Sequence, residues 1–343
     1  MRILIDILHP AHVHVFRCFR EVMRSRGHEV LVVSRVKDVT IPLLAAYGID
    51  HEVGSTAARG WIGFARELAA RTARVARLAR SFRADVVTGC MGPSAAPAAR
   101  AAGIPSVVLY NNETARLANM VAQSLATVYV TPQSYRRRVV GRHVRHSSFH
   151  ELAYLHPNRF RPDGAALFEM GLRAGEPFAL VRWVALASTH DRHVRGFEDR
   201  AAFVRGLGAR MRVVISSEDP VPADLAPLRV AVAPERLHDV LAHAALCVGE
   251  SATLAAEAAV LGVPAIYVAD SPRGYLLELE EKWGLVQNAP SADRARAALE
   301  RVPTPAECAE RRRAMLEQRG DLTAWLVEYF LARAWENARG AAP

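Results

Sequence analysis

Residues 246–265 read LCVGESATLAAEAAVLGVPA and hold a strand, a turn, a helix and a second strand in succession. The apolar run Leu246–Val248 predicts a short buried strand, which the small residues 249–251 end. Helical spacing over Ala252–Leu261 stops at Gly262, a residue that ends helices readily. A strand, a helix and a strand of these lengths predict a βαβ unit of a parallel sheet.

The same alternation continues on both sides of this stretch. Arg2–Ile7 predicts a strand, Val13–Arg26 a helix that Gly27 ends, and Glu29–Ser34 a second strand. Further strands are expected at 84–89, 106–110, 128–130, 178–186, 212–215 and 265–268. Further helices are expected at 38–47, 60–82, 93–102, 115–124, 198–209 and 234–244, with one or two more within 311–339. The predicted class is α/β, with two Rossmann-like, doubly wound parallel-sheet domains.

Length supports two domains, because 343 residues are about twice the usual domain length of ~150. Residues 136–161 lack clear periodicity and are interpreted as the connection. We therefore expect an N-terminal domain over 1–160 and a C-terminal domain over 161–320. A final helix over 321–343 is expected to return to the N-terminal domain.

Composition excludes several classes of protein. Hydrophobic residues make up 51% and charged residues 23%, an ordinary globular mixture rather than a disordered chain. The four cysteines form no CxxC pair, which argues against structural zinc and disulfides and fits a reducing cytosol. The first ten residues carry Asp6 and His9 inside their apolar run, unlike a signal peptide. We expect a cytoplasmic protein.

The net charge of +9 comes mostly from arginine. No nucleic-acid-binding motif accompanies it, so nucleic acid is not an expected partner. The predicted helix 60–82 carries an apolar stripe that includes Trp61 and Phe64, with arginines such as Arg66 and Arg77 mostly on the other side. This pattern indicates either a solvated charged face over a buried stripe or a contact with the inner, anionic face of a membrane.

The turn after strand 246–248 favours a phosphate ligand. Unpaired N–H groups and the helix dipole attract anions there, Ser251 and Thr253 add hydroxyl groups, and Ala252 leaves space. Glu257 lies further along the same apolar helix, where a carboxylate needs a partner. A ribose diol would supply two hydroxyl donors, and a nearby arginine is the alternative partner.

The turn after the first strand holds three histidines in six residues, His9, His12 and His14. Ligands bind beyond the carboxyl ends of strands in such sheets, so one of these histidines could serve as a general base. The alternative is that they cap the helix and pack against the next loop.

These residues lead to a resemblance. Residues 249–251 and 257–264 resemble the nucleotide-diphosphate-binding helix of GT-B glycosyltransferases and of non-hydrolysing UDP-N-acetylglucosamine 2-epimerases. Residues 234–244 are similar to the preceding helix of the N-acetylglucosaminyltransferase that makes lipid II. His12 falls where that enzyme has a histidine, although its glycines are replaced here by His9-Pro10-Ala11.

A more extensive resemblance, to the DUF354 family, covers nearly the whole chain. It rests on residues 9–16, 26–30, 150–160, 215–218 and 250–264. The resemblance implies a GT-B fold, whose two domains face a cleft, without a well-defined reaction. The sequence departs from the family at 110–113 and around 183–193, near the expected cleft, so the resemblance does not identify the substrate.

The resemblance also assigns residues to roles. His12, Glu113, His14 and Asn119 would face the acceptor, with His12 as first and Glu113 as second candidate base. Capping of the next helix is the alternative role of Glu113. His150 and Glu151 would lie at the hinge, where a hydrogen-bonding clamp is the alternative. The residues expected to bind the nucleotide sugar are Gly249, Glu250, Ser251, Ala252, Thr253, Glu257, Arg182 and His190.

No metal and no cofactor are expected, because GT-B enzymes stabilise the departing diphosphate with helix dipoles and basic residues. The run His190-Asp191-Arg192-His193 is a weak metal motif with no further ligand in view. The favoured function is transfer of a sugar from a UDP-sugar to a hydroxyl of a sugar or lipid-linked acceptor. The alternatives are a 2-epimerase and a nucleotide-sugar-binding protein without catalysis.

Overall fold

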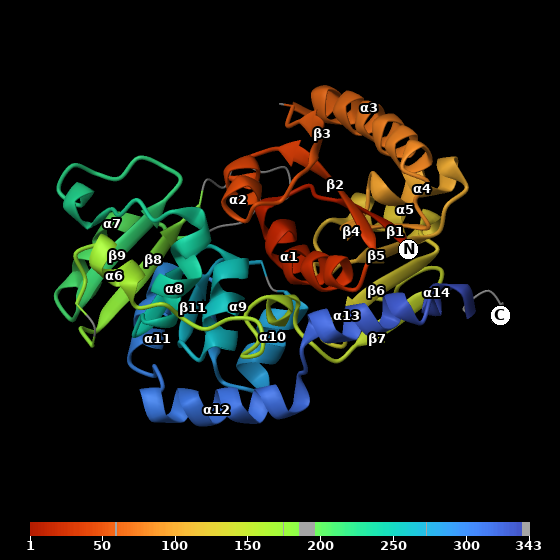
Figure 1. Ribbon diagram of the computed structural model, residues 1–343. Helices are drawn as coiled ribbons and strands as arrows, with labels where there is room; N and C mark the ends of the chain where they lie inside the picture. Colours follow the sequence, from red (N-terminus) through yellow and green to blue (C-terminus); the bar gives the residue numbers. More distant parts are fainter. Residues whose placement is uncertain (59, 174, 185–195, 272, 338–343) are drawn as a thin grey trace. The chain divides into compact units, whose positions relative to one another are not determined.

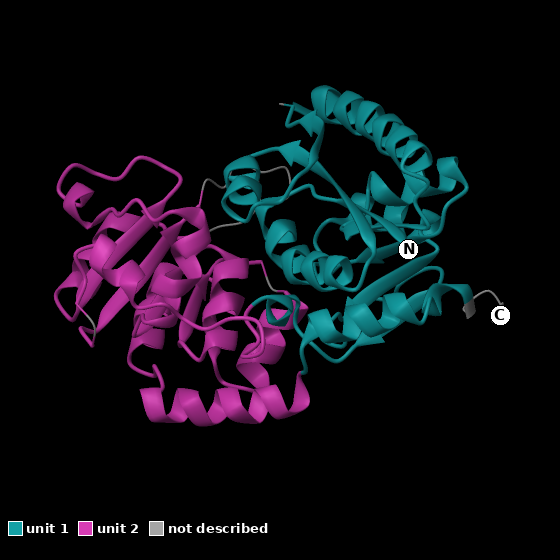
Figure 2. Cartoon of the chain, viewed as in Figure 1, with its two compact units in different colours: residues 1–154, 320–343 teal, residues 155–319 magenta. Residues whose placement is uncertain are grey.

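The computed structural model describes residues 1–58, 60–173, 175–184, 196–271 and 273–337 (Figure 1). The chain forms two compact units (Figure 2). Unit 1 comprises Met1–Tyr154 and the C-terminal segment from Gly320, and unit 2 comprises Leu155–Arg319. The expected domain boundaries lay at 160/161 and 320/321.

Unit 1 contains a sheet of seven parallel strands in the order β3-β2-β1-β4-β5-β6-β7. The strands are β1 (Arg2–Asp6), β2 (Glu29–Val36), β3 (Glu52–Thr56), β4 (Val86–Cys90), β5 (Ser106–Leu109), β6 (Val128–Pro132) and β7 (His143–His146). The helices are α1 (Pro10–Ser25), α2 (Thr40–Ala46), α3 (Gly60–Ser81), α4 (Ala95–Ala102), α5 (Arg116–Leu125), the 3₁₀ turn η1 (His150–Ala153), α13 (Leu322–Leu331) and α14 (Ala334–Asn337).

The centre of this sheet is β1, which pairs with β2 on one side and with β4 on the other. Ile3, Leu4 and Ile5 are 0% exposed because helices cover both faces of a doubly wound sheet. The C-terminal α13 packs on α1, and the rings of Phe19 and Phe330 lie 4.8 Å apart between these helices.

An arginine holds α3 against the sheet, which corrects the predicted stripe of that helix. Arg71 is 1% exposed and forms a buried ion pair with Asp6 at the end of β1. Its Nη1 also donates to the carbonyl oxygen of Ser34 at 2.7 Å. Trp61 and Phe64 are 76% and 43% exposed. Of the two interpretations of this helix, the buried stripe is therefore wrong for the first turns of α3 and holds further along, where Val75 is buried.

Unit 2 contains a sheet of five parallel strands in the order β12-β11-β10-β8-β9. The strands are β8 (Phe178–Trp183), β9 (Arg212–Ser217), β10 (Leu246–Gly249), β11 (Ala265–Val268) and β12 (Val286–Ala289). The helices are α6 (Ala165–Glu169), α7 (Arg200–Gly208), α8 (Leu237–Ala242), α9 (Ala252–Leu261), α10 (Gly274–Glu281), α11 (Ala292–Leu299) and α12 (Pro305–Gln318), with 3₁₀ turns η2 (Ala226–Leu228) and η3 (Pro234–Arg236).

The structure adds elements that the sequence did not predict. Strands β3, β7 and β12 were not predicted, and neither were helices α6, α10 and α11. Residues 136–161 are not only a connection, because β7 and η1 belong to unit 1. The predicted strand 178–186 ends as β8 at Trp183, and residues 185–186 lie outside the described residues. Within the described part of the chain, no helix combines the length and hydrophobicity needed to cross a bilayer.

Candidate functional site

The order of the strands points to a ligand site at the carboxyl ends of the strands in the unit 2 sheet. From β8 the chain passes outward to β9 and then returns to β10 on the other side of β8. Ligands of doubly wound sheets bind beyond the carboxyl ends of the strands where the order reverses in this way. The residues that follow β10 at this edge are Glu250 and Ser251.

Ser251 caps α9 at this edge. Its Oγ accepts a hydrogen bond from the N–H of Leu254 at 3.2 Å, and its carbonyl oxygen accepts from Ala255 at 3.0 Å. The N–H groups of Ala252 and Thr253 lie before the first intrahelical hydrogen bond. No carbonyl oxygen of α9 is available to accept from them. Together with the helix dipole, these N–H groups form a place of positive potential that suits a phosphate.

Glu257 lies inside the same helix and has a protein partner. Its Oε1 is 2.9 Å from Nε2 of His238 on α8, and both side chains are almost fully buried. Burial together with the nearby Glu257 raises the pKa of the Cys247 thiol on β10 to about 12. Neither the expected ribose nor the alternative arginine is therefore needed to explain how this carboxylate is accommodated.

Glu250 has a role in holding the segments around the site. Its carboxylate accepts from Arg200, whose Nη2 is 2.7 Å away, and from the backbone N–H of Phe197 at 3.2 Å. The N–H of Val184 approaches at 3.4 Å. The side chain of Glu250 is 1% exposed and both of its oxygens accept hydrogen bonds. Glu250 therefore holds the chain at Val184 and the segment from Phe197 to Arg200, and it is not accessible to a ligand.

Two other predicted residues of unit 2 also have structural partners. A Cβ on Gly249 would overlap the carbonyl oxygen of Arg182, so glycine allows β10 to lie close to β8. The guanidinium of Arg182 donates to Oγ of Ser216 at 2.8 Å and pairs with Glu218 at the same edge of the sheet. His190 lies outside the described residues.

In unit 1, His12 lies in the first turn of α1, beyond the end of β1. Its Nδ1 accepts a hydrogen bond from the N–H of Leu8 at 3.3 Å. An imidazole that accepts at Nδ1 carries its own proton on Nε2 when it is neutral. Burial, aided by the charges of His9 and His150, lowers the pKa of His12 well below its usual value. His12 is therefore a neutral donor in this geometry and a weak base.

His150 lies within electrostatic reach of His12. Burial lowers the pKa of His150 to about 4, and its ring stacks on that of His146 at 5.7 Å. Its Nε2 is buried without a hydrogen-bond partner among the described residues. Burial, and secondarily the charge of Glu151, raises the pKa of Cys90 at the end of β4. The structure thus brings η1 to the ends of β1 and β4, beside the turn that carries His12.

His14, by contrast, is packed between aromatic rings. Its ring stacks on Tyr154 at 5.2 Å and meets Tyr47 edge-on at 5.8 Å. The hydroxyl of Tyr47 is 3.4 Å from Nδ1 of His14. This placement supports the alternative that some histidines of the turn pack against neighbouring elements.

Glu113 lies in the turn after β5, and Asn119 lies on α5, the helix that follows this turn. Glu113 is 8% exposed, and its Oε1 accepts from the N–H of Arg136 at 3.0 Å. The amide of Asn119 donates to the carbonyl oxygen of Asn112 at 3.0 Å and accepts from the hydroxyl of Tyr129 at 3.1 Å. Asn119 therefore fixes the turn that carries Glu113.

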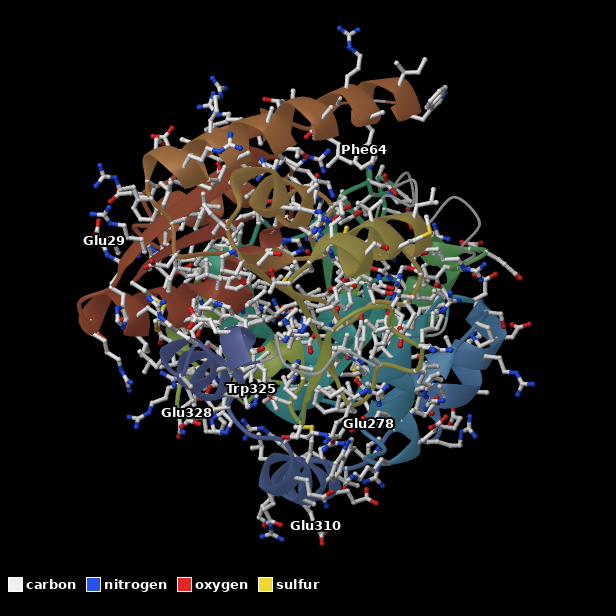
Figure 3. All side chains as sticks on the ribbon, turned by 90° about the vertical axis from the view of Figure 1, so that its right-hand side faces the viewer. Glu29, Phe64, Glu278, Glu310, Trp325 and Glu328 are labelled. Atoms are coloured by element: carbon white, nitrogen blue, oxygen red, sulfur yellow. The ribbon has the colours of Figure 1, made fainter. Side chains whose placement is uncertain are left out.

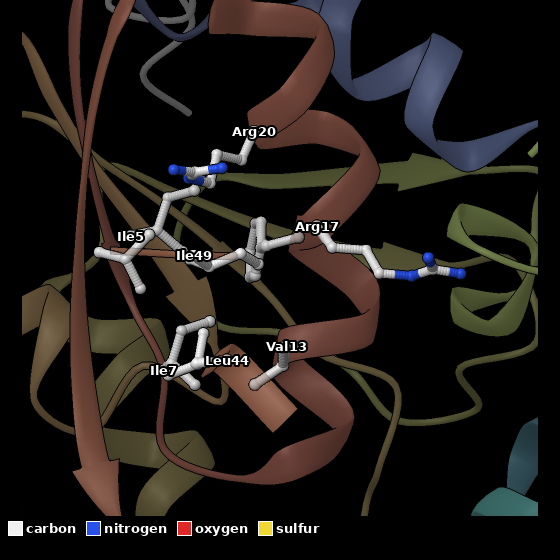
Figure 4. Close-up of a pocket in the computed structure, with 9 residues that line it drawn as sticks. Ile5, Ile7, Val13, Arg17, Arg20, Leu44 and Ile49 are labelled. Carbon is white, nitrogen blue, oxygen red and sulfur yellow. The ribbon is translucent and has the colours of Figure 1, made fainter. Parts of the chain in front are cut away.

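A cavity beneath α1 offers no ligand site. Its volume is about 10 Å³, and Ile5, Ile7, Val13, Leu44 and Ile49 line most of it (Figure 4). That space holds one water molecule at most. Among the described residues, no group of three or more His, Cys, Asp or Glu side chains is arranged to hold a metal ion.

Comparison with known proteins identifies the fold. No protein-family model and no curated protein matches the chain, so the resemblance to the DUF354 family is not confirmed. A Rickettsia bellii UDP-N-acetylglucosamine 2-epimerase superimposes with a TM-score of 0.67 at 13% identity, covering 97% of this chain and 96% of that one. The glycosyltransferase VinC, in complex with dTDP, gives 0.63 at 17% identity over 98% and 100% of the chains. S. aureus MnaA with UDP gives 0.67 at 11% identity over 100% and 98%. The chain has the GT-B fold.

Two residues that hold the site together, His238 and Arg200, were not predicted from the sequence. The histidine stood in the quoted stretch 234–244, where a polar side chain in a largely buried helix was the available signal. Arg200 gave no signal, because its partner Glu250 is 50 residues away along the chain.

Proposed function

We propose that the chain binds a nucleotide-diphosphate sugar, most naturally a UDP-sugar, at the Ser251-capped start of α9 in unit 2. The observation that carries this proposal is the position of that helix start, at the reversal of strand order, with buried Glu257 further along the helix. The diphosphate takes the N–H groups of Ala252 and Thr253. The ribose hydroxyls donate to the carboxylate of Glu257.

The proposed reaction is glycosyl transfer to a hydroxyl of an acceptor held by unit 1. VinC is a glycosyltransferase with a bound nucleotide diphosphate, which supports this class of reaction. The acceptor hydroxyl loses its proton as its oxygen bonds to the anomeric carbon, while the bond from that carbon to the diphosphate oxygen breaks and the nucleoside diphosphate leaves. The tautomer and lowered pKa of His12 favour a hydrogen-bond donor that orients the acceptor, so we assign the base to Glu113.

A screen of nucleoside diphosphates and their sugars by thermal shift tests the binding step. A ligand present at 100 times its Kd stabilises the folded state by ~2.7 kcal/mol. We expect uridine diphosphates to raise the melting temperature, while uridine, which lacks the diphosphate, does not. Absence of a shift with every nucleoside diphosphate would remove the basis of the proposal.

Epimerisation is the second candidate, supported by the solved epimerase that superimposes over nearly the full chain. Incubation with UDP-N-acetylglucosamine alone separates the two reactions. An epimerase converts the sugar without an acceptor, whereas a transferase leaves it unchanged until an acceptor is added. UDP binding without either conversion would indicate a binding protein.

A further inference from the structure

An exposed apolar face runs over three neighbouring helices of unit 1. Trp61, Ile62 and Leu117 are 76%, 57% and 77% exposed, and Met120 is 58% exposed. The first two begin α3, and the other two lie on α5. We call the surface of α3, α4 and α5 that carries these side chains the α3–α5 face. Figure 1 shows the three helices in one group, and Figure 3 shows Phe64 near the start of α3.

A shallow groove lies in the α3–α5 face. Its volume is about 590 Å³, and its lining includes Leu68 and Thr72 of α3, Pro97 of α4 and Val121 of α5. Nearly all of the side chains that line it are apolar. The exposed side chains of α3 and α5 are therefore parts of one continuous apolar surface, larger than the scattered residues normal for a protein surface.

Charge along this face is of one sign. α3, α4 and α5 contain a single carboxylate, Glu67, which is paired with Arg35 at 2.6 Å. Exposed arginines lie one helical turn from the apolar residues, Arg66 beside Ile62 on α3 and Arg116 beside Met120 on α5. The loop after β6 adds Arg137 and Arg138, and it packs beside α5 through the N–H of Val140, which donates to Gln123 at 3.1 Å. Among the described residues none of these four arginines pairs with a carboxylate.

We propose that the α3–α5 face docks on an anionic lipid bilayer. Aromatic and aliphatic side chains enter the boundary between headgroups and acyl chains, while arginines on the same face contact anionic headgroups. A protein partner would have to cover an almost purely apolar and basic surface with carboxylates of its own. A bilayer supplies acyl chains and anionic headgroups over its whole surface. An apolar and basic face therefore fits lipid better than a protein partner.

The proposal goes beyond the proposed function and does not depend on it. It also gives that function a location, because α3 and α5 begin at the carboxyl ends of β3 and β5. The same edge of the sheet carries His12 and Glu113. A bilayer against the first turns of α3 and α5 would present a lipid-linked acceptor at that edge.

Flotation with vesicles tests the proposal on the full chain. We expect the protein to float with vesicles of phosphatidylcholine and phosphatidylglycerol at about 0.1 M salt, and to be released at about 1 M, where the Debye length falls to ~3 Å. Vesicles of phosphatidylcholine alone should bind much less. Each arginine near an anionic membrane is worth about a fivefold change, so Arg116→Gln with Arg137→Gln should weaken binding about 25-fold.

The apolar contribution is tested separately. Trp61→Ser with Ile62→Ser should weaken binding by more than about tenfold while leaving the melting temperature unchanged, because both side chains are exposed. The matched controls lie in unit 2: Phe168→Ser, at a position 69% exposed, and Arg294→Gln with Arg313→Gln at exposed positions. These controls should float like the unaltered protein.

Three results would overturn the proposal. The first is no flotation with the anionic vesicles at low salt. The second is flotation that the variants of the α3–α5 face and the unit 2 controls reduce equally. The third is a dimer, measured by light scattering, that dissociates in Trp61→Ser/Ile62→Ser without any lipid binding, which would make the face an interface between two copies. UDP binding, measured in parallel, is expected to be the same for every variant, so failure here leaves the proposed function intact.

Discussion

Nε2 of His238 lies 2.9 Å from Oε1 of Glu257, and both side chains are buried between α8 and α9. The pair explains how a carboxylate can lie in a helix whose other residues are nearly all apolar. It also fixes the direction of the Glu257 side chain. In the proposed complex, a ribose hydroxyl also donates to this carboxylate.

Glu257→Gln tests this arrangement. The amide oxygen still accepts from His238, so the melting temperature should change little, whereas the charge that strengthens a bond to a ribose hydroxyl is lost. UDP affinity should fall by ~1.5–3 kcal/mol, or about tenfold to over a hundredfold, measured by calorimetry. The 2′,3′-dideoxyribose analogue of UDP should bind weakly and equally to both forms. Equal weakening of UDP and of the analogue, with a lower melting temperature, would show that Glu257 serves only packing.

Arg200→Ala tests the clamp on Glu250. The substitution leaves a carboxylate that is 1% exposed without its charged partner, and should destabilise unit 2 by about 3 kcal/mol in urea unfolding. Arg205→Ala on the same helix is the matched control, because its pair with Asp224 is half exposed and should contribute nothing measurable. Indistinguishable unfolding curves for the two variants would contradict the clamp.

The acceptor side offers a test by pairs of variants. Glu113→Gln keeps an oxygen for the N–H of Arg136 but removes the base, so transfer should slow by roughly 10²–10⁴-fold with UDP binding unchanged. His12→Gln retains a donor near Nε2 and should stay within about tenfold of the unaltered rate. His12→Ala loses the hydrogen bond and should cost about tenfold to a hundredfold. If His12→Gln is as inactive as His12→Ala while Glu113→Gln remains active, His12 is the base.

Stability should fall on acidification because of His150. Its pKa is about 4 in the folded protein, against an ordinary value of 6.5. Between these values the unfolded chain binds a proton that the folded chain does not, so stability is lost as the pH falls from 6.5 to about 4. The loss from this group is on the order of 3 kcal/mol. His150→Gln should flatten the profile of unfolding free energy against pH by that amount, and an unchanged slope would contradict the assignment.

The strands that the sequence did not predict share one physical property. β3, β7 and β12 each lie at the edge of a sheet and read EVGST, HVRH and VQNA. Central strands such as β1 and β10 are buried on both faces, so they appear as apolar runs. An edge strand is covered on fewer sides, carries polar residues, and is indistinguishable from a loop by periodicity.

Part of the candidate site could also be predicted from the sequence, and part of it could not. The helix start after β10 could be predicted because the local sequence alone defines a strand, a small turn and a helix. The partners of its acidic residues could not, because His238 and Arg200 reach Glu257 and Glu250 only through tertiary packing. Arg71 shows the same for α3: helical periodicity predicted the helix correctly, while the buried ion pair with Asp6 placed a charge on its inner side.

Titration of the protein with UDP by calorimetry, beside uridine, tests whether the start of α9 binds a nucleoside diphosphate. We expect saturable binding of UDP at one site per chain, much weaker binding of uridine, and a loss of about tenfold to over a hundredfold in Glu257→Gln. No saturable binding of UDP or of any other nucleoside diphosphate at millimolar concentration would contradict it.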